Sequence, residues 1–217
     1  MPIEPRAASR RMRELAALAP VIPVLVIEEA ARAAALGQAL VVGGLPVLEV
    51  TLRTPAAAAA IRALADLPGA VVGAGTVITP ADVDLAVASG ARFAVSPGAT
   101  DELLAACEAA GLPLLPGAAT ASEAMRLAAR GYDMLKFFPA GPAGGAKALA
   151  ALAGPLPGIS FCPTGGVSAE NAPDYLRLAT VPCVGGSWVA PKALIAAGDW
   201  AAIEALARQA RELTPAP

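Results

Sequence analysis

The sequence predicts an α/β fold: a single (β/α)8 TIM barrel with an additional helix at its N-terminus. Short β-rich apolar segments recur eight times at spacings of about 20 to 26 residues, and Ala-rich stretches with helical periodicity separate them. Such alternation with short connections implies parallel strands joined by right-handed crossovers, and eight repeats close most naturally into a barrel. An open doubly wound sheet is the alternative, but no G-x-G-x-x-G motif follows the first predicted strand.

The whole chain is expected to form one domain, because barrels of this kind commonly reach this length as one unit. An N-terminal helix is expected over residues 1–19 and the barrel over residues 20–213, without a linker. The predicted strands are, in chain order, 21–27, 47–52, 70–77, 93–96, 114–116, 134–138, 160–163 and 182–186.

Helices are predicted between these strands, and glycines and capping residues mark their limits. The clearest are 55–67, 80–89, 101–110, 121–130 and, after the last strand, 200–213. Threonine–proline pairs at 54–55 and 79–80 are typical of an N-cap before a first-turn proline, and Thr120 with Glu123 has the spacing of a capping box. Four glycines are expected to end helices in the left-handed conformation: Gly90, Gly111, Gly131 and Gly154.

Composition narrows the class of protein. Hydrophobic residues make up 56% and charged residues 16%, which favours extensive burial over disorder. A net charge of −2 with no basic cluster beyond the first residues speaks against nucleic-acid binding. No uninterrupted apolar run is long enough to cross a bilayer and no signal peptide is recognisable, so we expect no membrane association and a cytoplasmic location.

The cysteines and the missing histidines limit the chemistry. Cys107, Cys162 and Cys183 are odd in number and widely spaced, so we expect reduced core residues rather than disulfides or a zinc site. The sequence has no histidine, which removes the commonest general base and the commonest metal ligand. No metal and no cofactor are therefore predicted, and proton transfer falls to carboxylates, lysine, tyrosine, cysteine or water.

The second predicted strand carries polar residues that should face the barrel interior. The period of two in VLEVTLR puts Glu49, Thr51 and Arg53 on one face and the aliphatic residues on the other. Activity in such barrels lies at the carboxyl ends of the strands, where these residues stand. The alternative is a structural ion pair that orients two strands.

The sixth predicted strand contains the one lysine without an obvious path to water. Lys136 stands between bulky apolar residues, whereas Lys147 falls on a predicted helix and Lys192 follows the last strand. Burial and a nearby Arg53 both disfavour a charged ammonium, so an unprotonated amine, as a Schiff-base nucleophile requires, is expected near neutral pH. The alternative is a lysine neutralised by Glu49 or reaching solvent at the strand end.

Small residues end several strands and suggest what is bound there. GAGT (73–76), CPTGG (162–166) and VGGS (184–187) let backbone amides and hydroxyls approach a carboxylate or phosphate closely, and glycine loops after strands seven and eight form the recurrent phosphate site of this fold. Tight turns or barrel packing would also explain these glycines. SPG (96–98) and PGA (116–118) mark the mouths of strands four and five, where proline can simply end a strand.

Taken together, six segments closely resemble the 2-keto-3-deoxy-6-phosphogluconate (KDPG) and 4-hydroxy-2-oxoglutarate (KHG) aldolase family. They are VLEVTLRTP (47–55), VGAGTV (72–77), SPG (96–98), LKFFPA (135–140), FCPTGGV (161–167) and VGGSW (184–188). The resemblance runs from about residue 20 to residue 211, and EVTLRT and KFFPA are the most specific segments.

This resemblance implies a class I aldolase that cleaves KDPG to pyruvate and glyceraldehyde 3-phosphate. Lys136 would form the Schiff base and Glu49 would move protons, and the family is typically homotrimeric. The other positions carried over are Arg53, Thr76 and Thr164 for the pyruvate portion, Pro97 for the shape of its pocket, and Gly165, Gly166 and Ser187 for the phosphate end. A sister aldolase preferring 4-hydroxy-2-oxoglutarate, and a phosphosugar-binding barrel or oligomeric scaffold without activity, are the alternatives. The arginines before residue 20 receive no role.

Overall fold

Parallel strands and helices alternate along the chain in the computed structural model, which describes residues 1–215. Every strand pair is parallel, in the orders β5-β4-β3-β2-β1-β9 and β6-β7-β8. The strands are β1 (Val21–Leu25), β2 (Val47–Thr51), β3 (Val71–Gly75), β4 (Ala94–Val95), β5 (Leu114–Leu115), β6 (Gly117–Ala118), β7 (Met134–Phe137), β8 (Ser160–Pro163) and β9 (Val184–Gly186). The predicted (β/α)8 fold class is confirmed.

Within residues 1–215, nine strands occupy eight barrel positions because the fifth is divided in two. Pro116 separates β5 from β6, and proline has no N–H to donate to a neighbouring strand. Its carbonyl still accepts a hydrogen bond from the Lys136 N–H at 2.8 Å, so the ring remains connected there. A bridge between Thr164 and Gly185 connects β8 to β9 and closes the barrel on the other side.

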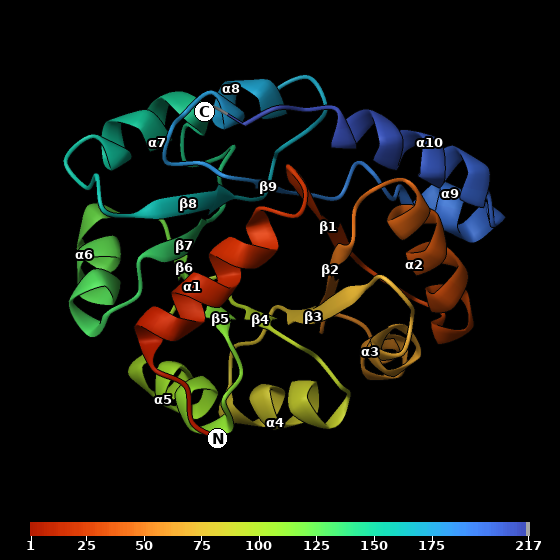
Figure 1. Ribbon diagram of the computed structural model, residues 1–217, viewed down its shortest axis with the longest axis horizontal. Helices are drawn as coiled ribbons and strands as arrows, with labels where there is room; N and C mark the ends of the chain where they lie inside the picture. Colours follow the sequence, from red (N-terminus) through yellow and green to blue (C-terminus); the bar gives the residue numbers. More distant parts are fainter. Residues whose placement is uncertain (216–217) are drawn as a thin grey trace.

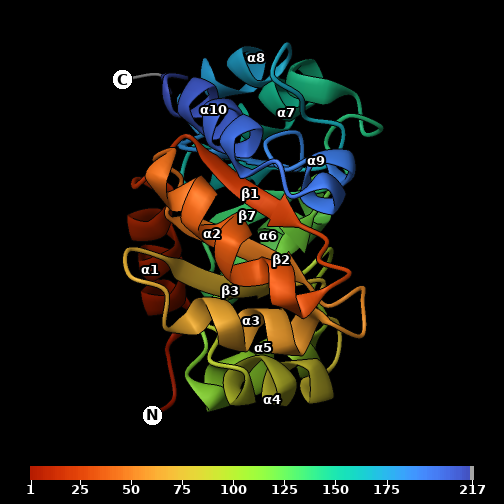
Figure 2. The ribbon, with the colours of Figure 1, turned by 90° about the vertical axis from the view of Figure 1, so that its right-hand side faces the viewer.

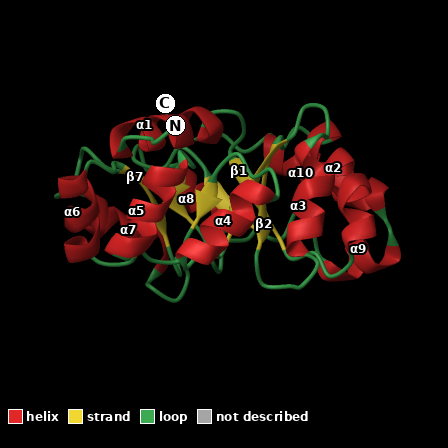
Figure 3. Cartoon of the chain, turned by 90° about the horizontal axis from the view of Figure 1, so that it is seen from below, coloured by secondary structure: helices red, strands yellow, loops and turns green. Residues whose placement is uncertain are grey.

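Helices surround this ring in Figure 1, and Figure 3 shows the strands in yellow enclosed by red helices. The helices are α1 (Pro5–Ala16), a 3-10 turn η1 (Ala30–Arg32), α2 (Ala33–Val42), α3 (Ala57–Ala65), α4 (Pro80–Ala88), α5 (Asp101–Ala110), α6 (Ala121–Arg130), α7 (Gly145–Ala153), α8 (Ala172–Leu176), α9 (Lys192–Ala197) and α10 (Trp200–Arg211). Among the described residues, none of these helices is long and apolar enough to cross a bilayer.

The additional N-terminal helix covers one end of the barrel. Helix α1 lies where strand β1 begins, away from the end toward which β1 points (Figure 2). Its Met12 and Leu15 are buried in the same apolar cluster as Phe93 from the barrel interior. Arg13 fixes the helix by donating to the Asp133 carboxylate at 2.7 Å and to the Asp133 carbonyl at 2.6 Å. One of the N-terminal arginines therefore has a structural role that the sequence did not reveal.

The predicted helix starts are correct at two positions and wrong at a third. Thr79 and Thr120 cap their helices, each within a complete capping box. Thr54 does not cap, because helix α3 begins later, with Ala56 as its N-cap residue. The Thr54 hydroxyl instead donates to the Ile27 carbonyl at 2.6 Å and so ties the loop after β2 to the loop after β1.

Three of the four predicted glycine helix ends adopt the left-handed conformation. The φ angles are +87° at Gly90, +69° at Gly111 and +110° at Gly131. The prediction is wrong for Gly154, which is right-handed with φ −49° and ψ −52°. Pro155 follows it and cannot donate a hydrogen bond to continue the helix, so no left-handed residue is needed to end it.

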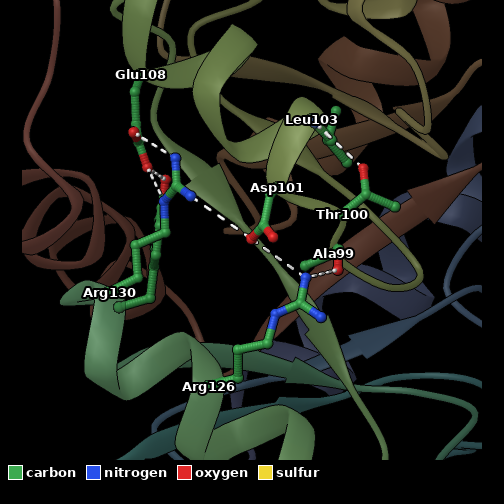
Figure 4. A network of polar contacts seen from close by, with 8 residues as sticks. Ala99, Thr100, Asp101, Leu103, Glu108, Arg126 and Arg130 are labelled. Atoms are coloured by element: carbon green, nitrogen blue, oxygen red, sulfur yellow. Dashed lines mark hydrogen bonds and ion pairs between the residues drawn. The ribbon is translucent and has the colours of Figure 1, made fainter.

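A network of charged side chains joins the outer helices α5 and α6 (Figure 4). Arg130 donates to both carboxylate oxygens of Glu108, at 2.8 and 2.9 Å, and the buried Tyr132 hydroxyl donates to the same carboxylate at 3.2 Å. Arg126 pairs with Asp101 at the start of α5. Neighbouring crossovers are thereby held together on the outside of the barrel.

Candidate active site

The inward side chains of the strands form an apolar layer next to α1 and a polar layer above it. Because side chains alternate along each strand, Val47 lies in the apolar cluster while Glu49 and Thr51 reach the layer above. Likewise Met134 is apolar and deep, and Lys136 lies one layer higher. The polar layer opens into a cavity of about 270 Å³ at the carboxyl ends of the strands.

All nine residues singled out from the sequence line this one cavity. They are Glu49, Arg53, Thr76, Pro97, Lys136, Thr164, Gly165, Gly166 and Ser187. They come from six different strand ends or the loops after them, so the fold brings together residues that span most of the chain. Their chemical roles remain proposals and are taken up below.

Lys136 and Glu49 form a buried ion pair in the middle of the cavity. The Lys136 Nζ and a Glu49 carboxylate oxygen are 3.4 Å apart, and the two residues are 5% and 3% exposed. They reach each other from β7 and β2, which are not neighbours in the ring. The pairing of Lys136 with Glu49, which the sequence left as an alternative, is present. It places the amine and the carboxylate close enough for a proton to pass between them.

Glycines of β3 make room for this pair. A Cβ atom at Gly75 would overlap the Glu49 carboxylate, and one at Gly73 would overlap the ring of Phe93. These glycines therefore serve barrel packing, the alternative explanation that the sequence left open for GAGT. The Glu49 side chain occupies the space that any other residue at 75 would fill.

An aromatic ring also lies close to the amine. The Phe138 ring centroid lies 5.2 Å from Lys136 Nζ, within the range of a cation–π contact. Gly165 faces this ring: a Cβ atom there would lie 3.0 Å from it. The Lys136 amine thus contacts both a carboxylate and an aromatic face.

The mouth of the cavity carries a cation and a strained hydroxyl residue. Arg53 is exposed at the rim, and none of the ion pairs found within residues 1–215 involves it. Thr76 has φ +60°, a left-handed conformation that costs a β-branched residue roughly 1–3 kcal/mol. Together with Lys136 and Glu49, Arg53 gives the cavity a net positive charge, which suits an anionic ligand.

The second side of the mouth consists of the loops after β8 and β9. Gly165 and Gly166 both have left-handed φ angles, +89° and +76°. Gly185 leaves space for the Thr164 side chain, and Gly186 for the Trp188 ring. In these loops, unlike in β3, the glycines Gly165 and Gly166 are also at the cavity wall, so their backbone is accessible to a ligand.

Of the two thiols below the cavity, that of Cys183 is a poor nucleophile. Cys162 and Cys183 are free and buried in the apolar layer below it, as the sequence predicted for core cysteines. A hydrogen bond with the Cys162 thiol, together with burial, raises the pKa of Cys183 well above its ordinary value. Because the thiolate is the reactive form, Cys183 does not compete with Lys136 as a nucleophile.

Five cavity residues received no individual site role from the sequence, although Gly185 lies in the VGGS loop that was expected to approach an anion. These are Val24, Thr51, Phe138, Val167 and Gly185. For Phe138 a signal existed, because it lies two residues after Lys136 and so shares its inward face. Thr51 was placed on the inward face but given no role; its hydroxyl donates to the Leu25 carbonyl at 3.0 Å. Val24 is one of several similar aliphatic residues, and its sequence context carries no signal.

Comparison with known proteins agrees with this geometry. The family model described as "KDPG and KHG aldolase" matches residues 12–206. The 2-dehydro-3-deoxy-phosphogluconate aldolase of Pseudoalteromonas atlantica is 50% identical over 192 residues, 88% of this chain and 89% of that protein.

Two solved structures are similar over nearly their whole length. The 2-keto-3-deoxy-6-phosphogluconate aldolase of Zymomonas mobilis ZM4 with 3-phosphoglycerate superposes with a TM-score of 0.91 at 47% identity, covering 96% of this chain and 98% of that one. The KDPG aldolase of Legionella pneumophila, with pyruvate captured as a covalent carbinolamine intermediate, has a TM-score of 0.88 at 48% identity, covering 91% and 97%. On the match of the family model over most of its length, the chain belongs to the KDPG and KHG aldolase family.

Proposed function

We propose that this protein is a class I aldolase that cleaves 2-keto-3-deoxy-6-phosphogluconate to pyruvate and glyceraldehyde 3-phosphate through an imine on Lys136. The observation that carries the proposal is the buried pair of Lys136 and Glu49, with 3.4 Å between amine nitrogen and carboxylate oxygen. A primary amine and an adjacent base in a closed site are what Schiff-base formation requires.

Imine formation begins with a proton transfer inside the pair. The Lys136 ammonium gives a proton to Glu49, and the neutral amine adds to the C2 ketone of the substrate to form a carbinolamine. Glu49 then returns its proton to the carbinolamine hydroxyl, which leaves as water while the C–N bond becomes an iminium. The carbinolamine with pyruvate in the Legionella pneumophila relative supports such a path.

Cleavage uses the iminium as an electron sink. The Glu49 carboxylate takes the proton of the C4 hydroxyl, directly or through a water molecule, and the C3–C4 bond breaks as the aldehyde forms. Its electron pair becomes the enamine of pyruvate. Glu49 then protonates C3, and water hydrolyses the resulting imine, which releases pyruvate and restores Lys136.

The surroundings favour the charged iminium. The Phe138 ring lies beside the nitrogen on which the positive charge develops, and its face is electron-rich. We assign Arg53, Thr76 and Thr164 to the keto-acid end, Pro97 to the shape of its pocket, and Gly165, Gly166 and Ser187 to the phosphate. The cation at Arg53 and the glycine backbone in the loop after β8, both at the cavity wall, support this division.

A second candidate substrate is 4-hydroxy-2-oxoglutarate, because the family carries both names and imine chemistry is indifferent to the distal group. Comparing kcat/KM for the two substrates decides between them. A barrel that only binds phosphosugars is disfavoured by the buried amine–carboxylate pair, which mere binding does not require. A homotrimer is part of the proposal on the resemblance alone, and a cytoplasmic location is supported by three buried free thiols, which suit a reducing compartment.

Trapping with borohydride and pyruvate tests the function. Reduction of the imine is expected to attach a three-carbon adduct to Lys136, detected by mass spectrometry of the digested protein. Lys136→Arg should abolish the adduct and the cleavage of KDPG, whereas Lys147→Arg, at an exposed position on α7, should change neither.

Glu49→Gln should still form some adduct but cleave slowly, by roughly 10²–10⁴-fold, because a positioned acid–base group is lost. An adduct on another residue, or full turnover by Lys136→Arg, would refute the assignment.

A further inference from the structure

The turn after β8 is fixed on its outer side by hydrogen bonds to its carbonyl groups. Ala140 N–H donates to the Thr164 carbonyl and Gly141 N–H to the Gly165 carbonyl, both at 2.8 Å. The third carbonyl in the series, that of Gly166, accepts from the side chain of Asn171 at 2.9 Å. Three consecutive carbonyls are therefore bound to protein donors, and none is left to face an anion in the cavity.

The N–H groups of the same turn are in the opposite situation. Within residues 1–215, no backbone or side-chain acceptor receives a hydrogen bond from the N–H of Gly166 or Val167. Both residues line the cavity next to Lys136. The turn thus has N–H groups without a protein acceptor among the described residues, while its carbonyl groups are hydrogen-bonded to other parts of the protein. Free N–H groups in a turn form an anion-binding site.

Asn171 holds this turn from both ends. Its Nδ2 donates to the Gly166 carbonyl and its Oδ1 accepts from the Ser168 N–H, each at 2.9 Å. A carboxamide can donate through its nitrogen and accept through its oxygen at once, whereas the carboxylate of an aspartate of the same shape has no donor. The two contacts also determine which end of the amide carries oxygen.

An ordinary capping role does not explain these contacts. Asn171 is the N-cap residue of α8, but its side chain makes no capping hydrogen bond to that helix. The side chain turns back toward the preceding residues, five and three positions earlier. The side-chain hydrogen bonds of Asn171 therefore fix the turn at the cavity wall and do not cap helix α8.

We propose that Asn171 is a positioning residue for the phosphate end of the substrate. Its carboxamide holds the 165–168 turn so that the Gly166 and Val167 N–H groups meet the phosphate of a phosphorylated keto acid. The inference rests on the proposed function and adds a residue that does not itself line the cavity. Pyruvate has no phosphate, so its reaction at Lys136 should not depend on Asn171.

The test separates the two ends of the substrate. Asn171→Ala should raise the KM for KDPG by roughly tenfold, as expected for the loss of a supporting hydrogen bond, while kcat changes less than about twofold. Borohydride trapping of pyruvate on Lys136 should keep its half-saturating pyruvate concentration. Ser168→Ala is the matched control, because it removes a side-chain hydrogen bond to Glu170 in the same turn but leaves the Asn171 contacts in place.

A second variant tests the inference in case Asn171→Ala folds poorly. Asn171→Asp keeps the acceptor for Ser168 N–H but loses the donor to Gly166, and should also raise the KM for KDPG. Measurement at two salt concentrations separates this effect from repulsion between the new charge and the phosphate, because only the repulsion is screened.

An unchanged KM in both variants overturns the inference, and so does an equal loss of pyruvate trapping and KDPG affinity. If the wild-type protein itself traps no pyruvate and cleaves no KDPG, the proposed function fails instead.

Discussion

The contribution of the buried Lys136–Glu49 pair to the stability of the folded protein can be predicted from its geometry. At 3.4 Å between Lys136 and Glu49, Coulomb's law with an effective dielectric constant of about 20 gives an attraction of about 5 kcal/mol. Both side chains are almost inaccessible to water, so a partner left alone keeps an uncompensated charge. Lys136→Met or Glu49→Gln should each lower the free energy of unfolding by about 3–5 kcal/mol.

The double variant should lose much less than the sum of the two single losses. Removing both partners leaves no buried charge, so a double-mutant cycle is expected to give a coupling energy of about 2–3 kcal/mol. The assay is urea unfolding at constant protein concentration, followed by the fluorescence of Trp188 and Trp200. Additive losses, within about 0.5 kcal/mol, would refute the reasoning.

The chain contains a matched control for this cycle. Lys192 and Glu28 are the same residue types at 3.3 Å, but their side chains are 72% and 64% exposed. The same double-mutant cycle there should give less than about 1 kcal/mol, because water and salt screen an exposed pair. The comparison isolates burial as the variable.

Two further variants test backbone strain and a charged helix cap. Thr76→Gly should raise the free energy of unfolding by up to about 1 kcal/mol, since glycine adopts φ +60° without strain. The same variant should weaken pyruvate trapping, because the Thr76 hydroxyl is lost. A lower free energy of unfolding than that of the wild type would contradict the strain argument. A hydrogen bond from the Ala119 backbone is the main cause that lowers the pKa of Glu123 below its ordinary 4.5 in the folded protein, and hydrogen bonds from the Thr120 side chain and backbone lower it further. The stabilisation by Glu123 is therefore present above pH 4.5 and is lost as the pH falls through the lowered pKa. Glu123→Gln should therefore be less stable than wild type at pH 7, and the difference should shrink in acid; a difference that is constant from pH 7 to pH 3 in urea unfolding would contradict this.

Local pattern alone established which residues face inward. The period of two in a strand determines the side on which Glu49 and Lys136 lie, because successive side chains point to opposite faces. The capping box of Thr120 with Glu123 could also be predicted, since both partners lie within one helical turn. The inward polar residues, and hence the chemistry, were therefore accessible from the sequence.

The tertiary structure decided which of these residues meet. Glu49 and Lys136 are 87 positions apart on strands that are not neighbours, and their height in the barrel depends on how the closed ring is staggered. The same holds for the Thr54 hydroxyl, which found the Ile27 carbonyl instead of a helix end. The role of Asn171 could not be predicted from the sequence, because its hydrogen-bond partners are backbone groups. Every residue has such groups, and only the folded turn brings these two within reach of the Asn171 side chain.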